Sequence, residues 1–86
     1  MQVGWWHRRG AVTQHRLTAI IERDGNWYVS LCPELDIASQ GNTVEEARAN
    51  LVEALGLFFA TASPEEIARR QGESEVYVTT VDIGVA

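Results

Sequence analysis

The chain has 86 residues, a formal net charge of −5 and a hydrophobic fraction of 45%, which indicate one small folded domain rather than a disordered segment. No apolar run approaches the roughly 18 residues of a membrane span, and the N-terminus lacks the apolar core of a signal peptide, so we expect a cytoplasmic protein. The single cysteine, Cys32, excludes an internal disulfide, and its place at the end of an apolar run predicts a buried thiol.

Charge is distributed unevenly along the chain. Residues 1–16 contain three arginines and no acid, whereas residues 17–86 contain four arginines and twelve carboxylates, a net of −8. An acidic body repels the phosphates of nucleic acids and suits a basic protein partner, because complementary charge speeds association. Acidity also keeps a small protein soluble, and composition alone leaves both interpretations open.

The first fifteen residues combine two glycines, two tryptophans and two histidines without clear periodicity. We expect residues 1–15 to form a flexible basic arm and residues 16–86 to form a single domain. The run Trp5-Trp6-His7-Arg8-Arg9 interleaves aromatic and basic side chains, which can stack on bases and pair with phosphates. Nucleic-acid binding through this arm is therefore an alternative function.

Two strands and a tight turn open the predicted domain. Residues 16–23 alternate between two faces, and residues 27–32 are rich in aromatic and β-branched side chains. Between them, Asp24-Gly25-Asn26 favours a hairpin turn, since Gly25 adopts positive φ without steric cost. Pro33 stops the second strand, residues 33–36 form a second turn, and residues 37–40 predict a third strand that Gly41 ends.

A long amphipathic helix should follow the third strand. Thr43 and Glu46 have the spacing of a capping box. The apolar residues after Thr43 recur at steps of three and four, which predicts a helix of about five turns. These residues are Val44, Ala47, Leu51, Leu55, Phe58 and Ala62.

A second, shorter helix and a final strand complete the prediction. Ser63, Pro64 and Glu66 repeat the signal for a helix start, and Gly72 is the expected end. Residues 76–85 then alternate, with Tyr77, Val81, Ile83 and Val85 on one face. The order is β-β-β-α-α-β, an α+β fold in which the long helix covers a three-stranded antiparallel meander. We expect the final strand to lie beside the first.

The final strand also bears on assembly. It is partly apolar on both faces, which is typical of a strand that is central in a sheet or covered by a partner. An exposed edge of a small sheet invites pairing. We therefore expect a homo-oligomer.

No specific catalytic constellation occurs in the sequence. His7 and His15 lack ligands at metal-binding spacing, and no phosphate-binding loop or nucleophile motif is present. We expect a protein that is not an enzyme and needs no cofactor or metal. A much less favoured alternative is a metal-dependent nuclease that uses Glu22, Glu53 and Asp82, because the spacing of these acids does not force them together and solvated surface positions explain all three.

The stretch 17–59 resembles the HicB family of antitoxins. After the hairpin and Pro33-Glu34-Leu35, residues 39–55 follow the pattern S-Q-G-x-T-x-E-E-A-x-x-N-L-x-E-A-L. The glycine of this pattern allows a sharp exit from the strand, the threonine and second glutamate cap the helix, and its apolar members pack on the sheet. The signature residues are Gly41, Thr43, Glu46, Ala47, Leu51, Ala54 and Leu55.

The resemblance implies a partial ribonuclease-H-like fold without a working nuclease site. It also implies a partner, a HicA-type toxin, which is a small basic ribonuclease that cuts mRNA and is neutralised when its active site is blocked. Family members form dimers or higher assemblies such as tetramers. Many carry a C-terminal DNA-binding domain, which we do not expect here because the chain stops at Ala86. A relative that has lost its toxin, an orphan HicB-like domain, is the alternative.

The acidic turn after the second strand is the preferred toxin contact. It comprises Glu34, Leu35 and Asp36, and exposed acids of the long helix are the second choice. A plain solvated loop is the competing interpretation of this turn.

Overall fold

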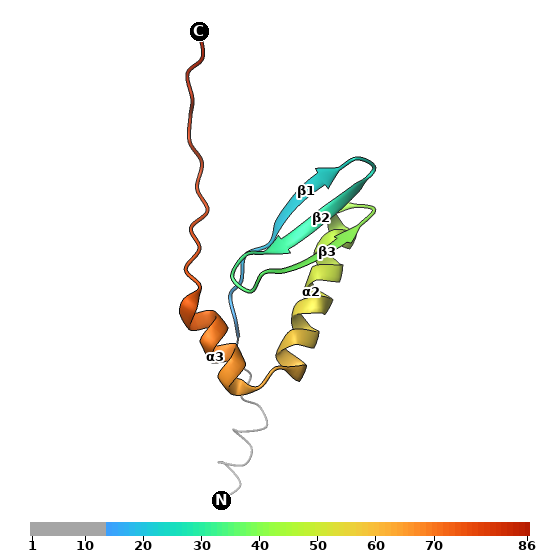
Figure 1. The fold of residues 1–86 in the computed structure, drawn as a ribbon. Coiled ribbons are helices and arrows are strands. Elements are labelled where there is room, and N and C mark those ends of the chain that lie inside the picture. The colour runs from blue at the N-terminus through green and yellow to red at the C-terminus, as the bar shows by residue number, and fades with distance from the viewer. Residues whose placement is uncertain (1–13) are drawn as a thin grey trace, which may run out of the picture.

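The computed structural model describes residues 14–86 and has the predicted α+β architecture, a three-stranded antiparallel sheet followed by two helices (Figure 1). The first thirteen residues, and with them most of the predicted basic arm, lie outside the described residues. The elements are β1 (Ile20–Asp24), β2 (Trp27–Cys32), β3 (Ile37–Gly41), α2 (Val44–Thr61) and α3 (Pro64–Glu73). None of the described helices is long and apolar enough to cross a membrane.

The sheet has the order β1-β2-β3. The predicted hairpin closes at the pair Asp24 and Trp27, with Gly25 at a φ of 65°. β1 is shorter than the predicted strand over residues 16–23. Its ladder starts at Ile20 because the position opposite Thr18 is Pro33, which has no N–H to donate. The N–H of Thr18 instead donates to the carboxylate of Glu34, in the turn between β2 and β3.

α2 packs along one face of the sheet and closes the core (Figure 1). Three side chains from three different elements of the chain, Cys32, Leu35 and Leu51, are buried there. Partly buried apolar residues surround them: Leu17, Ile37, Leu55, Phe58 and Phe59. Burial of these side chains is the main favourable contribution to folding, at about 25 cal/mol per Å² of apolar surface.

The first turns of α2 approach the sheet so closely that backbone meets backbone. A Cβ added to Gly41 would stand 2.5 Å from the amide nitrogen of Ala47. The hydroxyl of Ser30, which is fully buried, donates to the carbonyl of Ala47 at 2.8 Å. Thr43 caps the helix by accepting from the N–H of Glu46 at 3.0 Å, and the Glu46 carboxylate accepts from the N–H of Asn42. These contacts fix where α2 starts and how it lies.

The predicted final strand is absent from the described chain, and so is its predicted place beside β1. After α3 the chain runs from Ser74 to Ala86 as a drawn-out segment that pairs with no other part of residues 14–86 (Figure 1). Its β-branched residues favour an extended backbone. A strand needs a second strand to accept its N–H groups, however, and α3 directs this segment away from the sheet.

Gly41→Ala should destabilise the domain by about 1–3 kcal/mol, because the added methyl group collides with the backbone of α2. The control is Gly56→Ala, where nothing lies within 4 Å of the added Cβ in the interior of α2. That change should stabilise the helix by about 1 kcal/mol. Urea unfolding followed by circular dichroism measures both, and equal effects of the two changes would contradict the close approach at Gly41.

Candidate functional site

The turn between β2 and β3, where the sequence places the partner contact, directs its three candidate residues to three different environments. The N–H of Leu35 donates to the carbonyl of Cys32 at 3.3 Å and closes the turn. The Leu35 side chain, only 1% exposed, belongs to the core. Glu34 is half-buried, and Asp36 is exposed with a left-handed φ of 56°, a conformation that aspartate tolerates better than most residues. Asp36 is therefore the candidate that a docking protein can reach.

Glu34 braces the chain that leads into β1. Its carboxylate accepts from the N–H of Thr18 at 3.0 and 3.1 Å and from the Thr18 hydroxyl at 2.6 Å. Partial burial raises the pKa of Glu34, but hydrogen bonds from Thr18 outweigh it and hold the pKa below the usual value of a glutamate. The charged form of Glu34 thus stabilises the fold.

Cys32 is fully buried beneath this turn, as its position predicted. Burial raises the pKa of the Cys32 thiol, and the neighbouring Glu34 carboxylate, which accepts from Sγ at 3.4 Å, acts in the same direction. The thiol is a structural group rather than a nucleophile at neutral pH.

Arg70 holds α3 against the turn and against α2. Its Nη1 donates to the carbonyl of Leu35 at 2.9 Å, and its Nε donates to Glu66 at 2.9 Å. Its guanidinium lies over the ring of Phe58, 5.2 Å from the centroid. The sequence alone did not reveal this role, although the spacing of Glu66 and Arg70 matches a helical ion pair.

A shallow groove of about 290 Å³ lies between the turn and the end of α3. We call it the charged groove, and its charged residues are Glu34, Asp36, Arg69, Arg70 and Glu73. Hydrogen bonds from Arg69 and Arg70 lower the pKa of Glu66, so both arginines are engaged with a carboxylate of their own helix. Arg69 also lies 3.9 Å from Glu73. Among the described residues, Asp36 takes part in no ion pair.

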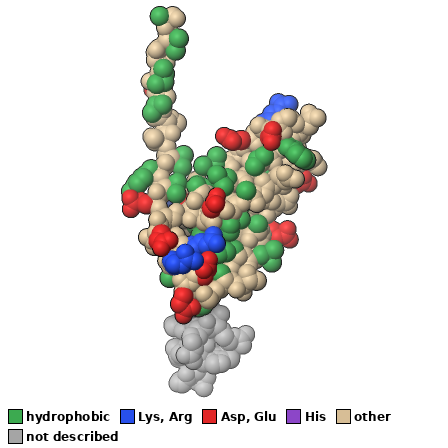
Figure 2. Space-filling model, in the orientation of Figure 1, with side chains coloured by type: hydrophobic (Ala, Val, Ile, Leu, Met, Phe, Trp, Pro, Cys, Tyr) green, Lys and Arg blue, Asp and Glu red, His purple; other side chains and the backbone are tan. Residues whose placement is uncertain are grey.

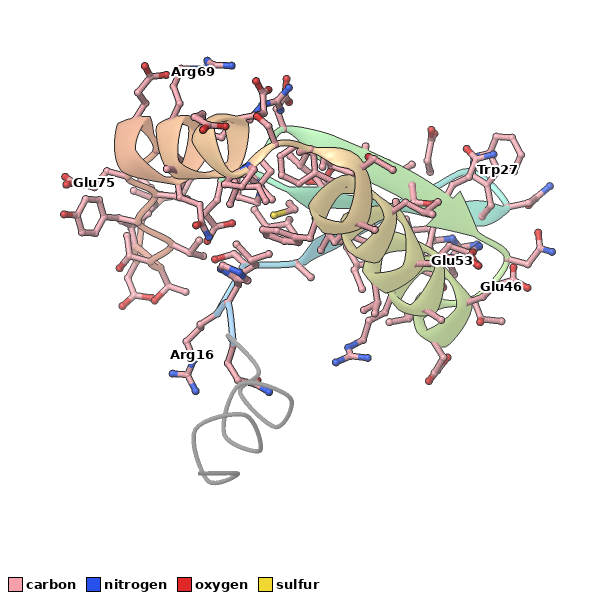
Figure 3. The ribbon with its side chains drawn as sticks, turned by 90° about the horizontal axis from the view of Figure 1, so that it is seen from below. Arg16, Trp27, Glu46, Glu53, Arg69 and Glu75 are labelled. Carbon is pink, nitrogen blue, oxygen red and sulfur yellow. The ribbon has the colours of Figure 1, made fainter. Side chains whose placement is uncertain are left out.

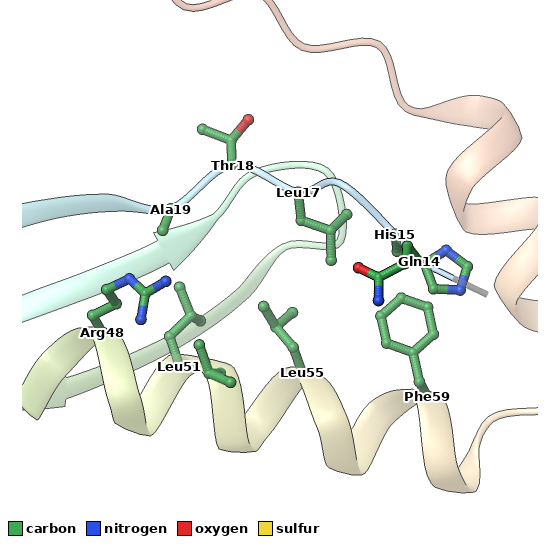
Figure 4. A pocket seen from close by; sticks show the side chains of 10 residues that line it. Gln14, His15, Leu17, Thr18, Ala19, Arg48, Leu51, Leu55 and Phe59 are labelled. Atoms are coloured by element: carbon green, nitrogen blue, oxygen red, sulfur yellow. The ribbon is translucent and has the colours of Figure 1, made fainter. Parts of the chain in front are cut away.

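A second groove, of about 390 Å³, lies between the chain that leads into β1 and the flank of α2 (Figure 4). We call it the apolar groove. Its apolar lining comes from Leu17, Ala19, Leu51, Val52, Leu55 and Phe59, with Arg48 at one end. At its other end the His15 ring stacks on Phe59 with centroids 4.4 Å apart, and Gln71 Nε2 lies 2.9 Å from His15 Nδ1.

The acids of the nuclease alternative come from separate elements. Glu22 lies on β1, Glu53 on α2 and Asp82 on the drawn-out C-terminal segment. Within residues 14–86 no three histidine, cysteine, aspartate or glutamate side chains gather closely enough to hold a metal ion. The structure therefore does not assemble the predicted carboxylate cluster. His7 of the arm lies outside the described residues.

The described chain is a small α+β domain in which one long helix covers an antiparallel meander. Comparison with known proteins finds no matching family model and no matching solved structure. The UPF0150 protein of Helicobacter pylori (strain J99) is 32% identical over 71 residues, which cover 81% of this chain and 97% of that protein. The chain belongs to the UPF0150 family.

Glu34→Gln should make the free energy of unfolding depend less on pH. Because the pKa of Glu34 is lowered by folding, its contribution is complete above the unfolded pKa of about 4.3 and disappears as the pH falls through the lower folded pKa. The substitution should cost about 1 kcal/mol at pH 7, an amount discounted for partial exposure, and less at lower pH. Unfolding free energies measured from pH 7 down to about pH 3 test this.

The matched control is Glu53→Gln, which changes an exposed carboxylate on α2. It should leave stability unchanged at both ends of the pH range. A Glu34→Gln curve that runs parallel to the wild-type curve would show that Glu34 does not stabilise the fold through its charge.

Proposed function

We propose that this chain is an antitoxin-like binding module, a HicB-type antitoxin that neutralises a HicA-type mRNA-cleaving toxin by covering the toxin's active site. Its role requires no catalysis and no cofactor. The observation that carries the proposal is the acidic body, with a net charge of −8 over residues 17–86. On the face drawn in Figure 2, acidic side chains spread from the sheet to α3.

Charge gives a physical reason for such inhibition. A ribonuclease holds its substrate through lysine and arginine side chains that pair with phosphates. An acidic protein surface offers the same side chains a competing partner and speeds the encounter. An interface of this kind needs apolar contact at its centre as well as charge at its rim.

The resemblance to HicB antitoxins supports the same function. The signature over residues 39–55 coincides with the close approach of α2 to the sheet, in which Gly41 and Ala47 are buried and Thr43 caps the helix. Membership of the UPF0150 family is compatible with this resemblance.

Asp36 is the proposed toxin contact at the rim of the charged groove. It is exposed, it takes part in no ion pair within residues 14–86, and it shares the groove with Glu73, whose side chain is 72% exposed. A lysine or arginine of the toxin placed there would pair with Asp36, beside Glu73, which lies 3.9 Å from Arg69. Glu34 supports the turn from behind, since its oxygens are engaged with Thr18.

The test begins with the tagged chain and a HicA-type protein encoded beside it or recovered with it from its own lysate. We expect a stoichiometric complex and loss of mRNA cleavage. Asp36→Arg should weaken binding about tenfold or more, as for a rim charge that is reversed against a basic partner. Titration calorimetry and an RNA-cleavage assay measure the two effects.

Glu53→Arg provides the matched control. It makes the same charge reversal on α2, far from Arg69 of the charged groove (Figure 3). Equal weakening by both changes would mean that net charge alone matters and that Asp36 is not the contact. Recovery of no partner, or a complex that leaves cleavage intact, would refute the antitoxin function and favour an orphan domain.

A further inference from the structure

We propose that residues 76–85 of one copy form a fourth strand on the open edge of β1 in a second copy, so that two copies exchange these segments reciprocally. The proposal concerns self-assembly and does not rest on toxin binding. It explains why a segment with the sequence of a strand has no partner within the described chain.

The donor is the drawn-out C-terminal segment. Its alternate residues Tyr77, Val81, Ile83 and Val85 are 81%, 76%, 76% and 88% exposed. Figure 2 shows hydrophobic side chains along its whole length. Alternation places these four side chains on one face of the extended chain, while Val76, Val78, Thr80 and Asp82 fall on the other. A row of apolar side chains of this kind is typical of a surface that another chain covers.

The acceptor is the outer edge of β1. The hairpin closes at the pair Asp24 and Trp27, and Thr18 donates toward the turn that follows β2. The N–H groups of even-numbered residues along β1 therefore face β2. Alternation turns the N–H groups of Ile21 and Arg23, and that of Ala19 just before the strand, to the open side. No strand among the described residues pairs with that side.

The apolar groove runs alongside the same edge, between the chain that leads into β1 and α2 (Figure 4). A strand added to β1 would cover this groove and lay its apolar face on Val52, Leu55 and Phe59. Val52 is 53% exposed, so the groove has apolar surface to bury. At β3, by contrast, α2 begins directly after the strand, and Asn50 Nδ2 on α2 donates to the carbonyl of Gln40.

The anchoring of α3 identifies the occupant as a second copy. Arg70 ties α3 to Leu35, and Gln71 contacts His15, so the direction in which the segment leaves is fixed (Figure 1). Residues 74–80 contain no glycine, proline, asparagine or aspartate that would reverse the chain toward its own β1. Reciprocal exchange around a twofold axis pairs the open β1 edge of each copy with a segment of the other, and the assembly closes at two copies.

The test uses the full chain at micromolar concentration in sedimentation equilibrium. We expect twice the 9.6 kDa mass of one chain. The double variant Val81→Asp with Ile83→Asp should have the mass of one chain, because it places two charges on the face that enters the groove. Val78→Asp, on the opposite face of the same segment, should remain a dimer. A monomeric wild-type chain, or a double variant that stays dimeric, would overturn the proposal.

A second variant changes the acceptor. Ala19→Pro removes an N–H on the open side just before β1, at an exposed position, so it should also give the mass of one chain while circular dichroism stays unchanged. Amide exchange supplies the direct readout. The N–H groups of Ala19, Ile21 and Arg23 should be protected in the wild-type dimer and should lose protection in the double variant. Protected amides in a monomer would mean that the segment folds back on its own chain and would also overturn the exchange.

Discussion

The contact between the start of α2 and the sheet is the constraint on which the rest of the structure depends. Gly41 leaves room for the backbone of α2, and the buried hydroxyl of Ser30 satisfies the carbonyl of Ala47. With the helix fixed at this point, Leu51 reaches the core one turn later. A side chain at residue 41 would collide with the backbone of α2 at Ala47, so this position requires a glycine for the helix to lie this close to the sheet.

At the turn between β2 and β3, polar interactions rather than close backbone packing hold the elements together. Arg70 connects α3 to the turn and to Phe58, and Glu34 connects the same turn to Thr18. The turn therefore joins three segments that are distant in sequence. Because these contacts occupy Glu34 and bury Leu35, Asp36 is left as the accessible part of the predicted contact.

Local signals in the sequence were sufficient for most of the fold. The turn around Gly25, the capping box of Thr43 and the cap at Ser63 each act within a few residues, so the strands and helices follow from them. Contacts between distant residues were not predictable in this way. Nothing local distinguishes Leu35 as a core residue or Arg70 as an anchor, and the alternation of residues 76–85 predicts an extended chain without saying which strand it pairs with.

The burial of Cys32 has a practical consequence. A thiol that is enclosed in the core and held in its protonated form reacts with alkylating reagents only when the surrounding structure opens. Since Cys32 is the single cysteine of the chain, the rate of its modification measures how often the core opens, and no label has to be introduced. The alkylation rate of Cys32 therefore reports local unfolding of the core.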